Sequence, residues 1–373
     1  MHSACGAVSH LFWVGAKLAK ARTRRLSESP QYVAANFFCQ LMGATLAALE
    51  IDPVATVTRI RDALRAQLSQ SLKRRGLVVG MSGGVDSSVC AALAVEAVGA
   101  GHVLGLFMPE RESDPESRSI AEYFARQLGI DTVSEDISPV LLAVGCYERR
   151  NEAIRRVVPE FADDWGCKLV LPPARLDSDR VNITYLVVQP PSGAARQVRL
   201  PASEYRQIVA ASNFKQRVRA MLEYYHADRL HYAVVGTPNR LEYDQGFFVK
   251  GGDGLADVKP IAHLYKTQVY QLAEFLGVPA AISSRPPTTD TFSLPQSQEE
   301  FYYAMPTDVL DIVLHARTED RPCTDVADET GLSVEQVERA FADIDQKRMT
   351  TRYLHLSAQL VEQVITEPSM VNV

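Results

Sequence analysis

The chain has 373 residues, enough for one large core or two ordinary ones, and its 46% hydrophobic and 23% charged residues are typical of a soluble globular protein. A formal net charge of −6 argues against a body that coats nucleic acid, and no apolar run is long enough to span a membrane. The cysteines form no Cys-x-x-Cys pair and indicate neither a zinc site nor a disulfide framework. We therefore expect a cytoplasmic protein with reduced thiols. Its cysteines are Cys5, Cys39, Cys90, Cys146, Cys167 and Cys323.

Residues 1–41 are predicted to be a flexible arm or the product of a start assigned too far upstream, with Met42 as the alternative start. The stretch 15–30 carries several lysines and arginines before Glu28, its first acid, and superficially resembles a transit peptide. Nothing later in the sequence points to an organelle, which favours the arm or the misassigned start.

The first regular elements are a helix, a strand and a second helix. From 52 to 75 apolar residues recur at helical spacing, which predicts an amphipathic helix. Residues 76–82, "GLVVGMS", predict a short buried strand, and a glycine turn leads from it into a helix over 86–98. Strand, glycine loop and helix in this order are typical of an α/β fold.

The same alternation continues along the chain. We expect strands at 102–109, 131–137 and 231–237, and helices at 117–130, 147–161 and 213–230. Strands separated by helices of this length predict parallel crossovers, and hence a doubly wound parallel sheet with flanking helices.

Two segments depart from this alternation. Residues 166–206 contain β-rich pieces punctuated by proline and glycine, which predicts a small antiparallel insertion. After Pro286 the sequence "TDTFSLPQSQEEFYYAMP" predicts a long polar and aromatic loop. Helices near 305–317, 322–331 and 333–348 then form a helical C-terminal part.

The glycine turn after the first strand has the character of a phosphate site. Ser82, Gly83 and Gly84 allow a sharp turn that exposes backbone N–H groups, while Ser87 stands in the first turn of the helix. Asp86 fits such a site only when a cation lies between it and the phosphate, so we expect Mg²⁺-pyrophosphate with Asp86 as a ligand. The alternative is a purely structural role, as a serine-glycine turn before a buried helix.

The motif "SGGVDSS" resembles, at every position, the PP-loop of the N-type ATP pyrophosphatase superfamily. The resemblance implies an adenine nucleotide alpha hydrolase-like fold and cleavage of ATP between its α and β phosphates. The superfamily includes ligases and tRNA-thiolating enzymes, so this motif leaves the substrate open.

The segment 235–270, "VGTPNRLEYDQGFFVKGGDGLADVKPIAHLYKTQVY", is similar to NAD synthase of the ammonia-dependent type. The similarity runs from about 52 to 290 and more loosely to 350, so we expect one synthase-like domain over 42–350, with a substrate loop and helical tail at 286–350 and a C-terminal tail at 351–373. It implies ATP contacts at Gly80, Ser82, Gly83, Gly84, Ser87, Thr237, Lys266 and Thr288, and magnesium at Asp86 and Glu242. It implies contacts to deamido-NAD at Arg217, Lys250, Asp257, Gln346 and Lys347.

The implied reaction is the formation of an amide from a carboxylate and ammonia. ATP converts the carboxylate of deamido-NAD into an acyl adenylate, which ammonia attacks, and NAD, AMP and pyrophosphate result. No covalent nucleophile is required, so catalysis rests on positioning and on charge, with Lys250 and Lys266 in electrostatic roles. Taken singly, these lysines are better explained as solvated surface residues, but their matching spacing in one segment favours the functional role.

The resemblance also implies partners. The residues before the synthase-like region cannot house a glutaminase domain, so we expect free ammonia or ammonia delivered by a separate amidotransferase. In the family a symmetric dimer builds the dinucleotide site from both subunits, and the helices at 52–75 and 213–230 are candidate interfaces.

Three departures keep a second hypothesis open. "DQKRM" has Gln346 where the family has histidine, the loop after Pro287 differs from the family pattern, and the insertion lies just ahead of Arg217. All three fall on the acid-binding side, so the alternative is an amide ligase for another carboxylic acid in specialised metabolism. A tRNA-thiolating enzyme is disfavoured because Cys146 and Cys167 lack a supporting motif.

Overall fold

The computed structural model describes residues 49–171, 184–286, 288, 291–303, 305–362 and 364. The predicted arm at 1–41 lies outside the described residues.

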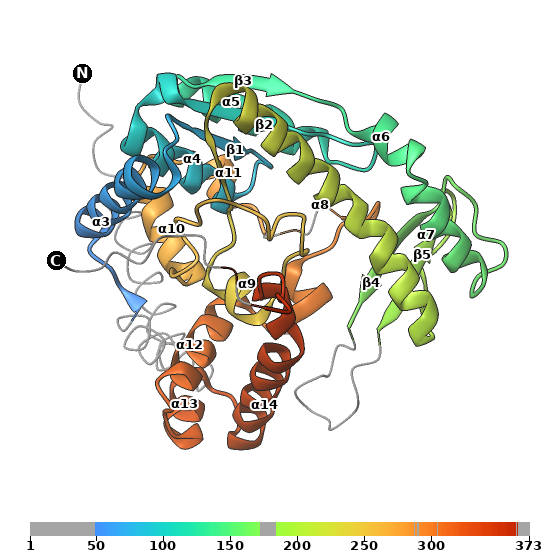
Figure 1. Ribbon diagram of the computed structural model, residues 1–373. Coiled ribbons are helices and arrows are strands. Elements are labelled where there is room, and N and C mark those ends of the chain that lie inside the picture. Colours follow the sequence, from blue (N-terminus) through green and yellow to red (C-terminus); the bar gives the residue numbers. More distant parts are fainter. Residues whose placement is uncertain are drawn as a thin grey trace, which may run out of the picture.

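A four-stranded parallel sheet forms the centre of the molecule, in the order β3-β2-β1-β7 (Figure 1). Its strands are β1 (Leu77–Gly80), β2 (Val103–Phe107), β3 (Asp131–Ser134) and β7 (Ala233–Val235). The first three strands follow one another outward, whereas β7 adds on the opposite side of β1. The order therefore reverses between β1 and β7, and ligands of open α/β sheets bind beyond the carboxyl ends of strands at such a reversal.

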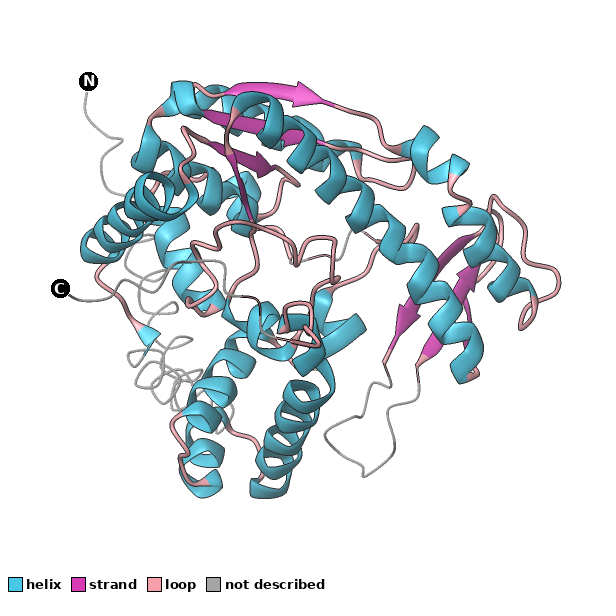
Figure 2. Cartoon of the chain, viewed as in Figure 1, coloured by secondary structure: helices cyan, strands magenta, loops and turns pink. Residues whose placement is uncertain are grey.

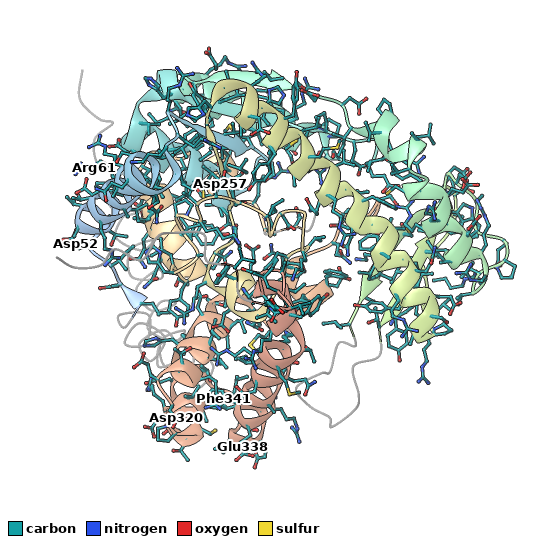
Figure 3. The ribbon with its side chains drawn as sticks, viewed as in Figure 1. Asp52, Arg61, Asp257, Asp320, Glu338 and Phe341 are labelled. Carbon is teal, nitrogen blue, oxygen red and sulfur yellow. The ribbon has the colours of Figure 1, made fainter. Side chains whose placement is uncertain are left out.

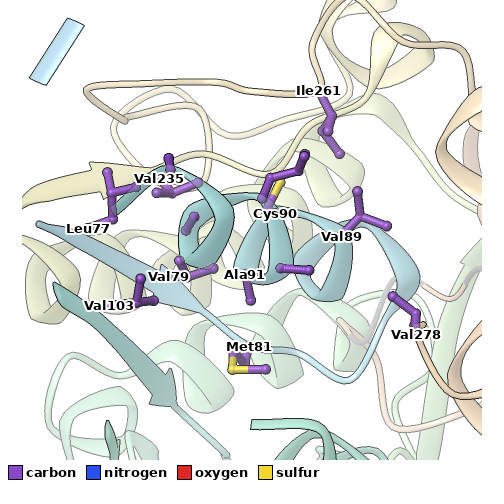
Figure 4. Packing of buried hydrophobic residues seen from close by; sticks show 14 of the residues in the cluster. Leu77, Val79, Met81, Val89, Cys90, Ala91, Val103, Val235, Ile261 and Val278 are labelled. Atoms are coloured by element: carbon purple, nitrogen blue, oxygen red, sulfur yellow. The ribbon is translucent and has the colours of Figure 1, made fainter. Parts of the chain in front are cut away.

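One face of the sheet is covered by α4 (Val85–Val98), α5 (Pro115–Leu128), α10 (Lys266–Phe275) and α3 (Pro53–Ala66), which continues as the π-helical turn η2 (Gln67–Leu72). The side chains of Leu77 and Val79 point into this layer, and Figure 4 shows them packed with Val89 and Cys90 of α4. The short elements η3 (Ala100–His102) and α11 (Ala280–Ser283) contribute Ala100 and Ile282 to the same layer.

The other face is covered by α6 (Ser138–Ala143), α7 (Cys146–Arg155) and α8 (Ala202–Leu230). Val78, Leu104 and Leu106, which alternate with the residues of the first face, pack in this second layer. Because helices cover both faces, the predicted doubly wound sheet is confirmed.

The predicted antiparallel insertion is a three-stranded sheet of β4 (Gly166–Val170), β5 (Tyr185–Gln189) and β6 (Arg196–Arg199). It lies beside α7 and the first half of α8 (Figures 1 and 2). The predicted start of the next helix was wrong, because α8 begins at Ala202 rather than at 213. Pro201 stands at its N-cap with extended backbone, and Ile208 and Ala211 are buried on its inner face.

The helical C-terminal part has its own core and forms the lower lobe in Figure 1. Its helices α12 (Thr307–Thr318), α13 (Cys323–Thr330) and α14 (Val334–Thr351) confirm the three predicted ones. The π-helical turn η5 (Glu299–Tyr303) precedes them and η6 (Arg352–His355) follows. None of the described helices is long and apolar enough to cross a membrane.

Candidate active site

The glycine loop joins the carboxyl end of β1 to α4, with Gly84 as the N-cap. Ser82 Oγ accepts a hydrogen bond from the amide of Gly84 at 3.3 Å and lies 3.2 Å from Ser87 Oγ. Ser87 Oγ in turn donates to the carbonyl of Gly84 at 3.0 Å. The two serines therefore brace the loop from within, and the N-terminal end of α4 attracts an anion through its free N–H groups and its dipole.

Position 83 requires glycine because of its backbone conformation and because of the atoms around it. Its φ of +84° is in the region that side chains rarely adopt, and a Cβ atom would collide with the carbonyl oxygen of Ser117 in α5. The close approach of the loop to α5 is therefore possible only without a side chain.

Three charged side chains meet beside this loop. Asp86 lies in the first turn of α4, Glu242 in α9 (Arg240–Gln245), and Lys266 at the start of α10. The Lys266 ammonium forms a buried ion pair with Asp86 Oδ2. The predicted metal ligands and one predicted ATP contact thus come together at the reversal between β1 and β7.

Local structure after β7 explains how Glu242 reaches this position. Asn239 caps α9 and forms a capping box with Glu242, whose Oε2 accepts the amide of Asn239 at 3.1 Å. Asn239 Nδ2 lies 3.3 Å from Asp86 Oδ1, so one side chain connects the turn after β7 with the first turn of α4.

Burial and charge shift the pKa values of this cluster. Burial, followed by the negative charge of Asp86, raises the pKa of Glu242 to about 8, although Lys266 acts in the opposite direction. Burial lowers the pKa of Lys266, but the carboxylates of Asp86 and Glu242 outweigh this effect and raise it. One ammonium therefore does not balance two carboxylates in this buried place, and Glu242 holds a proton more readily than an ordinary glutamate does.

The donor set fits a magnesium ion shared with phosphate. Carboxylate oxygens are the ligands that Mg²⁺ prefers, and this ion is usually held by one or two carboxylates together with substrate phosphates and water. Within the described part of the chain, no three acidic, histidine or cysteine side chains gather closely enough to hold a metal without other ligands. Asp86 and Glu242 match this open type of site.

The remaining predicted ATP contacts lie on β1, just after β7 and on the chain that follows α11. Thr237 is half-buried just after β7, at the carboxyl edge of the sheet. Thr288 is exposed and forms an isolated antiparallel bridge with Ser297. Gly80 is the last residue of β1, and a Cβ atom there would collide with the carboxylate of Glu223.

Two predicted substrate residues, Lys250 after α9 and Arg217 on α8, have protein partners. Lys250 Nζ donates to the carbonyls of Tyr353 and Leu356, at 2.7 and 2.9 Å. The Arg217 guanidinium, exposed on α8, lies 3.4 Å from the carbonyl of Lys250. Both belong to one surface region that includes the segment after α14.

The other predicted substrate residues contribute to the fold. Asp257, labelled in Figure 3, accepts the amide of Val234 at 2.8 Å and so satisfies the outer edge of β7. Lys347 is buried, pairs with Asp343 at 2.9 Å and donates to the carbonyl of Tyr302 at 2.9 Å. Gln346, its neighbour on α14, is exposed. Their roles toward substrate stay predictions.

Sequence reasoning missed several residues around Glu242. The role of Asn239 as a helix cap could have been predicted, because Asn followed three positions later by Glu is a capping pattern. No sequence pattern indicates Gln298, whose side-chain amide donates to Glu242 Oε1 at 3.0 Å. The buried Tyr303 hydroxyl has no partner among the described residues, and burial followed by the charge of Glu242 raises its pKa.

Known proteins resemble this chain over most of its length. The family model for NAD synthase matches residues 56–158 and 179–353. The NH(3)-dependent NAD(+) synthetase of Rhizobium rhizogenes is 55% identical over 317 residues, which cover 85% of this chain and 95% of that protein. The enzyme of the same name from Thermotoga maritima is 35% identical and covers 71% of this chain and 87% of its own.

Solved structures show the same fold at lower identity. An NMN synthetase from Francisella tularensis aligns with a TM-score of 0.56 at 21% identity, over 83% of this chain and 99% of its own. An NH3-dependent NAD synthetase from Campylobacter jejuni aligns with a TM-score of 0.54 at 19% identity, over 84% of this chain and 100% of its own.

The matched parts of the family model contain both halves of the site described above, the glycine loop with Asp86 and the segment with Glu242 and Lys266. The interval that the model leaves out, 159–178, includes β4 of the insertion. Since the family model matches well over half of the chain, and relatives above 50% identity cover more than four fifths of it, the chain belongs to the NAD synthase family.

Proposed function

We propose that this chain is an ammonia-dependent carbon–nitrogen ligase that converts deamido-NAD to NAD with consumption of ATP and release of AMP and pyrophosphate. The observation that carries the proposal is the meeting of Asp86, Glu242 and Lys266 beside the glycine loop. Relatives named NH(3)-dependent NAD(+) synthetase, at 55–57% identity, support the reaction and the acid.

The chain's own residues supply most of what the reaction needs. N–H groups of Gly83 and the first turn of α4 hold the pyrophosphate leaving group, and Lys266 balances the charge that develops on it. Asp86 and Glu242 hold Mg²⁺, which when bound neutralises phosphate oxygens. Because the acid becomes an adenylate, AMP rather than oxide leaves when ammonia attacks the acyl carbon.

We propose deamido-NAD rather than another carboxylic acid as the substrate because the similarity to the synthetases extends over nearly their whole length. The rhizobial synthetases match this chain over 94–96% of their own length. The departures at Gln346 and in the loop after Pro287 are therefore changes within an otherwise retained framework. The solved structures add only the fold to this argument.

The test is AMP release with ATP, Mg²⁺ and ammonium, run with deamido-NAD and with a panel of other carboxylic acids. We expect AMP and NAD in equal amounts with deamido-NAD, and loss of both in Asp86→Ala. Turnover with another acid but not with deamido-NAD would favour the alternative ligase. An active Asp86→Ala variant would contradict the metal role.

The nitrogen source is proposed to be free ammonia, in line with the names of the relatives. At a fixed total ammonium concentration, turnover is expected to rise with pH because the fraction of unprotonated NH₃ rises. Glutamine at the same concentration is expected to give no NAD in the absence of ammonium. Glutamine-supported turnover by the purified chain would refute this part of the proposal.

A further inference from the structure

The segment 291–303, which follows the exposed Thr288, reaches Glu242 through the side chain of Gln298. Gln298 Nε2 donates to Glu242 Oε1 at 3.0 Å, while the amide of Asn239 donates to Oε2 at 3.1 Å. Two donors from segments far apart in the sequence therefore hold the two oxygens of Glu242. Without Gln298 one oxygen has lost its donor and the carboxylate can rotate.

The backbone of this segment follows the free edge of strand β4, whose other edge pairs with β5. The amide of Leu294 donates to the carbonyl of Cys167 at 3.2 Å, and the amide of Leu171 donates to the carbonyl of Glu300 at 3.0 Å. The side chain of Gln296 adds a hydrogen bond to the carbonyl of Leu169. The segment thus covers the edge of the insertion sheet that would otherwise expose unpaired backbone groups.

The side chains of the segment also join the core of the insertion. Phe292 is buried in the same cluster as Leu169 and Leu186, and Phe301 packs against it. A Cβ atom on Gly166, the first residue of β4, would collide with the side chain of Leu294. The segment and the insertion sheet are therefore packed as one unit.

Two lysines anchor the segment at its ends. Lys168 on β4 binds both carboxylate oxygens of Glu300 at 2.8 Å and the carbonyl of Pro295 at 3.1 Å. Lys215 on α8 is almost fully buried and donates to the carbonyl of Thr291 at 2.8 Å.

The second anchor belongs to a wider network of buried charge. Lys215 also pairs with Glu110 at 2.6 Å and Glu112 at 2.8 Å, and Arg150 binds Glu112 through two hydrogen bonds. Burial raises the pKa of Glu112, but Arg150 and Lys215 outweigh this and lower it to about 2. Glu112 therefore stays ionised at neutral pH, and Lys215, which it pairs with, holds Thr291 against α8.

We propose that Gln298 is a positioning residue of the ligase site and that the antiparallel insertion is the scaffold that fixes it against Glu242. The inference rests on the proposed function, because it concerns a carboxylate assigned there to Mg²⁺. Gln298 lies between the two anchored ends of its segment, so strand β4, far from the glycine loop in sequence, determines where one metal ligand points.

The first test is the variant Gln298→Leu, which keeps the approximate size of the side chain and removes its donor. ATP binding is measured by calorimetry across a series of Mg²⁺ concentrations. Loss of a hydrogen bond to a metal ligand typically weakens metal binding by about 10-fold or more, so the half-saturating Mg²⁺ concentration is expected to rise by about 10-fold at an unchanged melting temperature. An unchanged Mg²⁺ dependence would overturn the proposal.

The second test removes an anchor and leaves the site residues intact. In Lys168→Met, hydrogen exchange at the amides of Leu171 and Leu294 is expected to accelerate, and the Mg²⁺ requirement for ATP binding to increase. Arg196→Met is the matched control, because Arg196 lies in the same sheet but pairs with Glu160 on the surface. Equal behaviour of the two variants would overturn the role of the insertion.

These measurements are separate from the test of function. Neither the Mg²⁺ titration nor the exchange measurement uses deamido-NAD. A wild-type chain that fails to convert deamido-NAD would refute the proposed function alone, whereas a normal Gln298→Leu variant of an active enzyme would refute this inference alone.

Discussion

At the scale of single residues, Gly83 has the most demanding position in the glycine loop. Gly83→Ala introduces strain at φ +84° and a collision with the carbonyl of Ser117. Backbone strain of this kind costs about 1–3 kcal/mol, and relief of the collision would move the loop away from α5. We expect a loss of ATP affinity of at least about 10-fold by calorimetry, since the N–H groups that we propose hold the phosphate would be displaced.

Gly99 offers the matched control for this prediction. Its φ is +80°, but a Cβ atom there would meet nothing within 4 Å, and it ends α4 at the far end from the loop. Gly99→Ala is expected to lower the melting temperature and to leave ATP binding unchanged. Equal ATP affinities for the two alanine variants would show that the loop tolerates a side chain.

The proximity of Asp86 and Glu242 could be expected from the sequence because their positions follow from topology. Asp86 and Glu242 each come shortly after a strand, and the carboxyl ends of adjacent parallel strands lie at one edge of the sheet. The surroundings of Lys250 were not predictable, because its partners are backbone carbonyls from a distant segment. The same holds for the contact of Lys347 with the carbonyl of Tyr302, although its pairing with Asp343 is local. Such contacts depend on packing and leave no local pattern in the sequence.

At the scale of elements, Asp311 joins the helical lobe to the α/β body. It is fully buried on α12, and its carboxylate accepts the amides of Lys266 and Thr267, the first residues of α10, at 3.2 and 2.7 Å. Burial outweighs these hydrogen bonds and raises the pKa of Asp311 from 3.8 to about 6. The folded chain therefore holds this proton more tightly than the unfolded chain.

The sign of the pH dependence follows from that difference. The contribution of Asp311 to stability is fully present below its unfolded pKa of 3.8 and is lost as the pH rises through about 6. A shift of this size corresponds to about 3 kcal/mol. We expect the free energy of unfolding of the wild type, relative to Asp311→Asn, to fall by about that amount between pH ~4 and pH ~7 in denaturant titrations.

The control is Asp320→Asn, at an exposed residue labelled in Figure 3. Its stability relative to the wild type is expected to change little over the same pH range. A flat difference between the wild type and Asp311→Asn would contradict the raised pKa.

Elements with a clear periodicity were predicted, and pairings between distant elements were not. The strands and helices from 76 to 137 and the three C-terminal helices follow their patterns of apolar residues closely. The start of α8 was missed because prolines and β-branched residues precede Pro201. The docking of 293–300 on β4 was also missed, since pairing across more than one hundred residues of chain depends on the fold and not on local propensity.

At the scale of the whole molecule, we expect the outer face of α8 to be the surface that contacts a second copy of the chain. Arg217, Met221 and Tyr225 follow one another at intervals of four residues, so they lie along one face of this helix. Met221 and Tyr225 are 55% and 59% exposed, which leaves a large apolar surface in water. The predicted substrate residue Arg217 thus shares its face with the apolar pair, as a site built from two subunits requires.

We therefore expect the wild type to sediment as a dimer, and the double variant Met221→Glu with Tyr225→Glu to sediment as a monomer. Four buried carboxylates, two from each subunit, would have to lose water and repel one another at the interface, which is expected to raise the dissociation constant by at least about 100-fold. Tyr123→Glu is the matched control, because Tyr123 is 55% exposed on α5, which covers the opposite face of the sheet. If the site is shared, the double variant also loses affinity for deamido-NAD and retains its affinity for ATP, because the glycine loop lies within one chain. A wild type that is monomeric at micromolar concentrations and fully active would refute the shared site and leave Arg217 as a residue of its own subunit's surface.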